Sequence, residues 1–183
     1  MKVLANDGIS ESGKNALLEA GIEFLEAKVS QEHLANFINE NQIDVLLVRS
    51  ATNVRQELID ACPTLKIIGR GGVGMDNIDV EYAIEKGIFV INTPTASSRS
   101  VAEMVFAHFF SLARFLHESN RLMPLEGDTH FSAMKKVFAK AVELEGKTLG
   151  VIGFGSIGRE VVKMGISLGM KVKVLTRQPR TET

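Results

Sequence analysis

The part of the sequence with the most evident chemistry is a glycine-rich turn at residues 153–158. An apolar run at residues 148–152 precedes it, and residues 157–168 then carry apolar side chains at helical spacing. A turn between a strand and a helix directs backbone N–H groups and the positive helix end at one point, which suits a pyrophosphate. Three glycines make the turn, admit the phosphate and let the helix pack on the strand. We therefore predict a dinucleotide-binding turn formed by Gly153, Phe154, Gly155, Ser156, Ile157 and Gly158.

The end of the next strand departs from the usual dinucleotide-binding pattern. This strand is expected at residues 171–175, and a carboxylate that holds the adenosine ribose normally follows it. Thr176 and Arg177 stand there instead, and we include both in the predicted cofactor site. Arg177 either contacts the 2′-phosphate of NADP or is a solvated side chain at a strand end, so the choice between NAD and NADP stays open.

A second candidate site lies where the strands of the first half of the chain end. Ligands of open parallel sheets bind at the carboxyl ends of the strands, and two strands are expected to end near Arg49 and Arg70. Free backbone N–H groups flanked by guanidinium groups bind a carboxylate or a phosphate. The predicted residues of this anion site are Arg49, Ser50, Arg70, Val73 and Gly74. In the alternative interpretation, both arginines pair with Asp7, Asp76 or Asp79 and only hold the loops.

The elements that must position these residues alternate along residues 1–97. Alternating β and α segments favour a parallel sheet covered by helices on both faces, here an α/β domain of flavodoxin-like size. The expected strands are residues 2–6, 22–25, 44–48, 66–69 and 88–91, and the expected helices are residues 11–20, 31–39, 54–61 and 80–85. Ser10, Ser30 and Asn53 are predicted to cap helix N-termini.

A domain boundary is expected near Ser97, and residues 98–183 form a second part. Ser100 and Glu103 have the spacing of a capping box, which predicts a linker helix over residues 100–118. Because this helix is apolar on almost every side, we expect it to be buried, either between domains or subunits or inside one domain. A polar connector with a short helix at 134–141 follows. The glycine-rich turn then starts a Rossmann nucleotide-binding domain with only two evident strands, so we expect the chain to be part of a longer protein.

The composition argues against several other functions. Residues 1–97 carry 8 basic and 14 acidic side chains, and this acidic excess disfavours nucleic-acid binding. Residues 121–183 carry 11 basic and 6 acidic side chains, so the basic excess lies in the part of the chain with the glycine-rich turn. No apolar run approaches the roughly 20 residues of a membrane span, and the N-terminus reads as a strand rather than a signal peptide. Cys62 is the only cysteine, so we expect no intrachain disulfide and a cytoplasmic location. No cysteines and histidines stand at zinc-binding spacing, so we expect no zinc site.

Several runs of sequence together resemble the D-isomer-specific 2-hydroxyacid dehydrogenases. They are VRSAT at residues 48–52, IGRGGVGMDNID at 68–79, NTP at 92–94 with SVAE at 100–103, and LEGKTLGVIGFG at 144–155. The resemblance covers nearly all 183 residues and is closest to the members that oxidise D-3-phosphoglycerate. It departs from the family at Thr95, Ser97 and Thr176, and a connector tryptophan is replaced by nearby Phe131 and Phe138.

The resemblance implies a substrate domain at residues 1–97 and a partial NAD(P)-binding domain at residues 98–183. The N–H groups of Val73 and Gly74 would hold the substrate carboxylate, and Arg49 and Arg70 would serve its other anionic end. The expected cofactor is NAD, with NADP as the alternative, and the expected assembly is a homodimer. The family's catalytic Arg, Glu and His are expected beyond Thr183, so the 183-residue chain alone is expected to be inactive.

Two other functions remain open at this stage. The first keeps the reaction but changes the substrate to glyoxylate, hydroxypyruvate or another small 2-ketoacid. The second is a non-catalytic NAD-sensing protein that resembles the corepressors of this fold, since fold alone does not establish activity.

Overall fold

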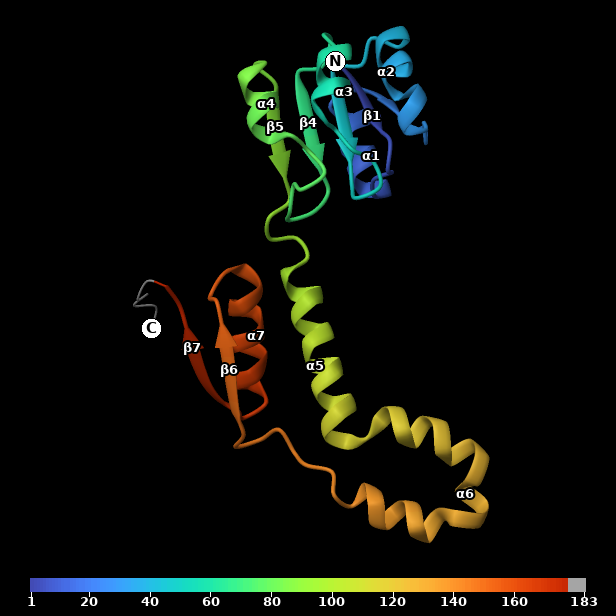
Figure 1. The fold of residues 1–183 in the computed structure, drawn as a ribbon, viewed down its shortest axis with the longest axis vertical. Helices are drawn as coiled ribbons and strands as arrows, with labels where there is room; N and C mark the ends of the chain where they lie inside the picture. Colours follow the sequence, from blue (N-terminus) through green and yellow to red (C-terminus); the bar gives the residue numbers. More distant parts are fainter. Residues whose placement is uncertain (178–183) are drawn as a thin grey trace. The chain divides into compact units, whose positions relative to one another are not determined.

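The computed structural model describes residues 1–177, which divide into two compact units (Figure 1). The first unit comprises Met1–Ala96, and the second begins at Ser97.

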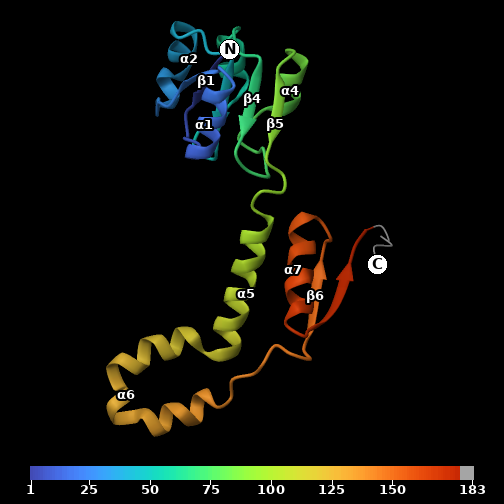
Figure 2. The ribbon, with the colours of Figure 1, turned by 180° about the vertical axis from the view of Figure 1, so that it is seen from behind.

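The first unit is built on a five-stranded parallel sheet with the order β2-β1-β3-β4-β5. The predicted α/β fold with a parallel sheet is therefore confirmed. The strands are β1 (Lys2–Ala5), β2 (Glu23–Leu25), β3 (Val45–Val48), β4 (Ile67–Arg70) and β5 (Phe89–Asn92). The helices are α1 (Glu11–Glu19), α2 (Gln31–Glu40), α3 (Gln56–Ala61) and α4 (Val80–Glu85). In Figure 2, which shows the molecule from behind, α1 lies in front of the sheet.

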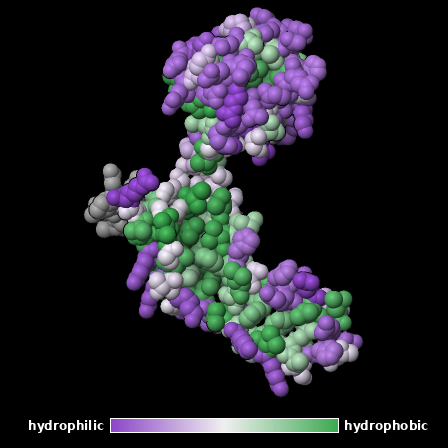
Figure 3. Space-filling view, in the orientation of Figure 1, coloured by the Kyte–Doolittle hydropathy of each residue, from purple (hydrophilic) through white to green (hydrophobic). Residues whose placement is uncertain are grey.

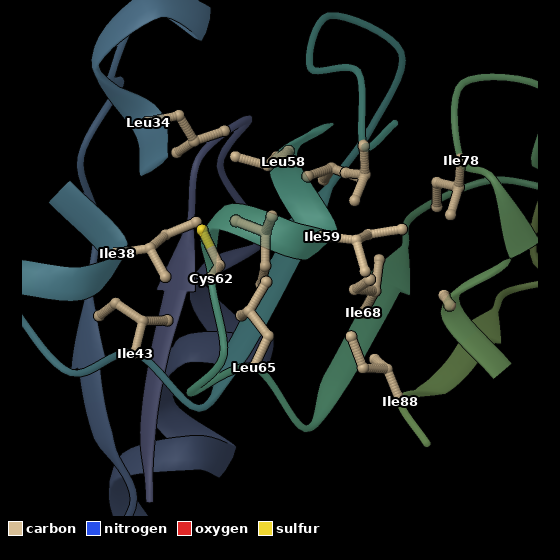
Figure 4. Close-up of a cluster of buried hydrophobic side chains, with 14 of the residues drawn as sticks. Leu34, Ile38, Ile43, Leu58, Ile59, Cys62, Leu65, Ile68, Ile78 and Ile88 are labelled. Carbon is tan, nitrogen blue, oxygen red and sulfur yellow. The ribbon is translucent and has the colours of Figure 1, made fainter. Parts of the chain in front are cut away.

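Apolar burial holds α2 and α3 to the sheet. Leu34 and Ile38 of α2 are fully buried, Leu34 beside Leu58 of α3 and Ile38 beside Cys62 (Figure 4). They belong to one buried cluster with the strand residues Leu46 and Ile68. Fully burying one such side chain stabilises the fold by about 1.5–3 kcal/mol, which exceeds the roughly 1 kcal/mol of a typical helix cap. Packing on the sheet therefore dominates the stability of these short helices.

The helix caps agree only in part with the sequence prediction. Ser10 caps α1, because its hydroxyl accepts the N–H of Gly13 over 3.2 Å. Ser30 occupies the N-cap of α2, but its hydroxyl bonds to the His33 ring instead of the backbone. The prediction for Asn53 was wrong, since α3 begins two residues later, after Arg55. The carboxylate of Asp79 accepts the N–H of Gln56 there and so replaces a local cap.

The second unit contains a strand–turn–helix–strand segment, as the sequence predicts. β6 (Thr148–Ile152) pairs in parallel with β7 (Lys171–Leu175), and α7 (Ser156–Ser167) connects them. A small buried cluster of Ala102, Phe106, Leu149 and Val161 joins this segment to α5 (Ser98–Arg114). The opposite face of the two strands is open in residues 1–177, with Ile152 88% exposed.

The prediction for the long helix was wrong in its boundaries, and the single chain does not bury it on every side. α5 begins at Ser98, so Ser100 lies inside the helix and the predicted capping box does not open it. It ends at Arg114, because Phe115 adopts a left-handed conformation with φ 54°. Leu112 is 77% exposed and Met104 is 60% exposed, so the helix is not buried on every side within this chain. Figure 3 shows the hydrophobic surface of the second unit.

The connector is helical over most of its length, which the sequence did not predict. α6 spans Leu116–Phe138 and contains Pro124, and its helical geometry is interrupted at His130. Its mixed polar and apolar composition, together with Pro124, hid the helical pattern. Among residues 1–177 no helix is both long and apolar enough to cross a membrane, and no cluster of potential metal ligands occurs.

Candidate functional site

A cavity of about 720 Å³ lies where β1, β3, β4 and β5 end, at the carboxyl edge of the sheet. Arg49 and Arg70 both line it, together with Asn92 at the end of β5. Two segments border this edge, and we call residues 49–52 the arginine loop and residues 71–76 the glycine loop. The structure therefore brings the two predicted arginines together, while Ser50 lies exposed on the arginine loop beside the cavity lining.

The side chain of Arg49 is exposed, and its backbone is fixed. Its N–H donates to Asp7 Oδ2 over 2.6 Å. Within residues 1–177 its guanidinium makes no ion pair, although Asp7, Asp76 and Asp79 all lie in the same unit. The guanidinium of Arg49 is thus free to meet an anion in the cavity.

Arg70 is held by the loop that follows it. Its side chain is only 14% exposed, and Nη1 donates to the carbonyl oxygen of Gly74. Nη2 lies 4.0 Å from the carboxylate of Asp76, while Nε is buried without a partner among the described residues. The loop-holding interpretation therefore describes Arg70 better than Arg49.

The glycine loop presents unused donors. The backbone N–H groups of Val73 and Gly74 donate to no protein acceptor within residues 1–177. The loop itself is fixed, because the side-chain amide of Asn92 donates to the Val73 carbonyl over 2.7 Å and the N–H of Thr93 donates to Gly72. Adjacent free N–H groups in a fixed turn form a small anion-binding site.

Asp7 is a structural anion and a poor base. Its burial opposes ionisation, but hydrogen bonds from the backbone of Arg49 and from the hydroxyl and backbone of Thr52 outweigh this effect and hold its pKa below the ordinary value. A carboxylate with a lowered pKa holds the arginine loop well and accepts a proton poorly at neutral pH.

The glycine-rich turn of the second unit has the geometry that a dinucleotide requires. Gly153 has φ 95°, a conformation that favours glycine, and a side chain on Gly158 would collide with the carbonyl oxygen of Gly153. A side chain on Gly155 would meet open space. The N–H groups of Gly155, Ser156 and Ile157 donate to no acceptor among the described residues. Free donors at the N-terminus of the 12-residue α7 therefore fit a pyrophosphate.

Residues 3–177 match the catalytic domain of the D-isomer specific 2-hydroxyacid dehydrogenases. The chain belongs to this family. It is 41% identical over 172 residues to a hydroxypyruvate reductase of Thermotoga maritima, with 93% of this chain and 54% of the relative covered. It is 42% identical over 172 residues to a D-3-phosphoglycerate dehydrogenase of Methanocaldococcus jannaschii, with 94% and 31% covered.

Solved structures of similar fold carry either nicotinamide cofactor. The NAD+-bound 3-phosphoglycerate dehydrogenase of Entamoeba histolytica has a TM-score of 0.69 at 30% identity, over 100% of this chain and 56% of that one. An acyclic imino acid reductase in complex with NADPH and D-Arg has a TM-score of 0.82 at 27% identity, over 100% and 58%.

The chain aligns with only part of each longer relative in the 2-hydroxyacid dehydrogenase family. The chain spans about half the length of the hydroxypyruvate reductase and about a third of the D-3-phosphoglycerate dehydrogenases that it matches. The family match includes both the carboxyl edge of the first sheet and the glycine-rich turn of the second unit.

Sequence reasoning named Asp7 only as a possible partner of the arginine side chains, and it missed Asn77 and Asn92 as residues that hold the loops of this family member in place. Asp7, Asn77 and Asn92 each bond to the backbone of a segment at least 19 residues away in sequence. The available signal was weak: an acidic or amide residue stands just after a strand or a turn in each case.

Proposed function

We propose that the whole protein is an NAD(P)-dependent dehydrogenase that transfers a hydride between a 2-hydroxyacid and a nicotinamide cofactor, with D-3-phosphoglycerate as the leading substrate. One observation carries the proposal. Arg49, whose guanidinium makes no ion pair within residues 1–177, lines the cavity at the carboxyl edge of the first sheet together with Gly71 of the glycine loop. Val73 and Gly74, whose N–H groups have no acceptor among the described residues, lie farther along that loop and outside the cavity lining, and the chain also carries the predicted dinucleotide-binding turn.

The two kinds of donor suit the two ends of a phosphorylated hydroxyacid. The N–H groups of Val73 and Gly74 would bind its carboxylate, because two adjacent donors match two carboxylate oxygens. Arg49 and Ser50 would meet the phosphate, and charge-assisted hydrogen bonds from a guanidinium are among the strongest available. Arg70 would fix the glycine loop and keep its positive charge beside the anion.

The residues that line the cavity within residues 1–177 can bind an anion but offer no group for proton transfer. The ionisable side chains that line the cavity within residues 1–177 are those of Asp7, Arg49 and Arg70, and none is a suitable base near neutral pH. The nicotinamide supplies the hydride chemistry when it is bound. We propose that the catalytic Arg, Glu and His lie after Thr183 and that the 183-residue chain alone is inactive.

We propose NAD as the cofactor, with weaker discrimination against NADP than an acidic residue would give. Thr176 follows β7 where the ribose-binding carboxylate is usual, and the exposed Arg177 comes next. A neutral residue does not repel a 2′-phosphate, and a guanidinium attracts one.

A hydroxypyruvate reductase is the second candidate for the same chemistry. The Thermotoga maritima relative with that name is as similar to this chain as the phosphoglycerate dehydrogenases, and it is covered over a larger share of its length. Hydroxypyruvate carries no phosphate, so this substrate would leave the Arg49 guanidinium without its partner.

We also propose a homodimer formed through the second unit and a cytoplasmic location. Leu112, Leu125 and Phe131 of α5 and α6 are more than half exposed, and large exposed apolar patches are typical of interaction surfaces. The buried free thiol of Cys62 is compatible with a reducing compartment. Light scattering of the full-length protein would give its subunit number.

An NADH absorbance assay on the full-length protein tests the proposed function. Phosphohydroxypyruvate reduction should be faster than hydroxypyruvate or glyoxylate reduction at equal concentration, and D-3-phosphoglycerate should be oxidised when NAD is supplied. Faster reduction of hydroxypyruvate would favour the second candidate. Binding of NADH without turnover of any of these substrates would refute both.

A further inference from the structure

We propose that Asn77 is a positioning residue that holds the arginine loop against the glycine loop, so that the anion-binding groups of both loops face the same ligand. The proposal rests on the proposed function, because it assumes that the cavity at this edge binds the substrate. Asn77 itself lies just after the glycine loop and outside the cavity lining.

Asn77 connects the two loops through a single buried amide. Its side chain is part of a residue that is 5% exposed, and Nδ2 donates to the carbonyl oxygens of both Arg49, over 2.8 Å, and Thr52, over 2.7 Å. The backbone of Asn77 adds a third link, because its carbonyl oxygen accepts the N–H of Val54 over 2.8 Å. Both ends of the arginine loop are thus bonded to one residue at the end of the glycine loop.

Asp7 completes this arrangement at the same two residues of the arginine loop. Its carboxylate accepts the N–H groups of Arg49 and Thr52, the same two residues whose carbonyl oxygens Asn77 binds. Asp7 therefore binds the backbone N–H groups of Arg49 and Thr52, and Asn77 binds the backbone carbonyl oxygens of the same two residues. This pairing fixes the direction in which the backbone of Arg49 presents its side chain, although the guanidinium itself is unpaired within residues 1–177.

The polar groups of Asn77 indicate a positioning role rather than stabilisation alone. Its Oδ1 is buried without a hydrogen-bond partner among the described residues, and an unsatisfied buried acceptor costs stability. Rotating the amide would not relieve this, because Oδ1 would then face the two carbonyl oxygens. Asn77 is therefore unfavourable at its Oδ1, while its Nδ2 binds both carbonyl oxygens. Buried polar atoms without a partner are expected mainly at functional sites.

The first test uses Asn77→Asp in the full-length protein, because aspartate has the same shape and, when ionised, donates no hydrogen bond. The KM for the hydroxyacid substrate should rise by up to about tenfold, because substrate binding must then also order an arginine loop that has lost two hydrogen bonds to Asn77. kcat should change less than about threefold and the Kd of the cofactor should not change, since the variant misplaces binding groups only.

The matched control is Asn41→Asp, which makes the same change where the amide donates to Phe37 at the end of α2, away from the cavity. It should leave the substrate KM unchanged. An unchanged KM in Asn77→Asp, or an equal rise in the control, would overturn the proposal.

The second test needs no substrate and therefore separates this proposal from the proposed function. Hydrogen exchange of the full-length Asn77→Ser variant should be faster at residues 49–52 and 71–76 than in wild type, with β1, β3 and β4 unchanged. Unchanged exchange in both loops, or faster exchange throughout the first unit, would overturn the proposal. If wild type turns over no hydroxyacid while the loops still loosen together, only the proposed function fails.

Discussion

The carboxylate of Asp7 accepts the backbone N–H of Arg49 over 2.6 Å, which joins the end of β1 to the end of β3. The same carboxylate also binds the hydroxyl of Thr52 over 2.7 Å. The carboxylate of Asp7 therefore binds the backbone of the arginine loop and does not pair with the guanidinium of Arg49, which can bind another anion. This relationship has a measurable consequence for stability as a function of pH.

Asp7→Asn should lower the thermal midpoint of the first unit at neutral pH. Hydrogen bonds to an ionised group contribute about 1.5–3 kcal/mol, and partial exposure of Asp7 reduces this to about 1–2 kcal/mol. Because the pKa of Asp7 is lowered in the folded state, its contribution is present above the unfolded pKa of about 3.9 and is lost as pH falls through the folded pKa. Thermal melts should therefore show a constant difference between the two proteins from pH 7 to about pH 5, and a difference that shrinks as the pH falls below the unfolded pKa. A difference that stays constant as the pH falls well below the unfolded pKa would contradict the assignment.

Arg49→Ala should weaken binding of the phosphorylated substrate selectively. Loss of a charge-assisted contact of about 1.5–3 kcal/mol corresponds to roughly ten- to hundredfold in affinity. Isothermal titration with full-length protein should find cofactor affinity unchanged. Arg99→Ala removes an exposed arginine from the second unit and is the control. Arg70→Ala should also lower the melting temperature, since Arg70 bonds to its own loop; a similar loss of stability in Arg49→Ala would show that Arg49 is structural.

The sequence could predict the strands and the glycine-rich turn because their signals are local. β6 and β7 have the predicted boundaries, β1, β2 and β3 are one residue shorter than predicted at one end, and β4 and β5 begin and end one residue later than predicted. α6 was missed because Pro124 and its mixed polar and apolar side chains obscure the helical spacing. Asn53 was wrongly predicted as an N-cap because the carboxylate of Asp79, 23 residues after Gln56, accepts the N–H of Gln56 at the start of α3. The bonds of Asn77 and Asn92 to distant loops likewise leave no local pattern, so only the structure reveals them.

Gly158→Ala should disrupt cofactor binding. The added methyl group would press on the carbonyl oxygen of Gly153, which is rigid backbone, so α7 would have to move away from the turn. NADH fluorescence titration of the full-length variant should give an affinity at least about tenfold lower, because the N–H groups of the turn would no longer converge. Gly150→Ala in β6 is the matched control, since its methyl group would meet nothing within 4 Å. Equal affinities of the two variants would contradict the predicted turn.

Thr176→Asp should make the protein discriminate against NADP. A carboxylate at this position can bind the ribose diol of NAD and repels a 2′-phosphate. Titrating both cofactors against wild type and variant should show a larger loss for NADP than any change for NAD. A wild type that already rejects NADP strongly would refute the argument from Thr176 and Arg177.

The central claim is that this chain belongs to a protein that oxidises the D-isomer of a 2-hydroxyacid with a nicotinamide cofactor. The most direct measurement compares NAD reduction at 340 nm by the full-length protein with the D- and L-isomers of 3-phosphoglycerate. The account predicts turnover of the D-isomer and little or none of the L-isomer. Absence of turnover with either isomer and with D-glycerate, or a preference for the L-isomer, would contradict it.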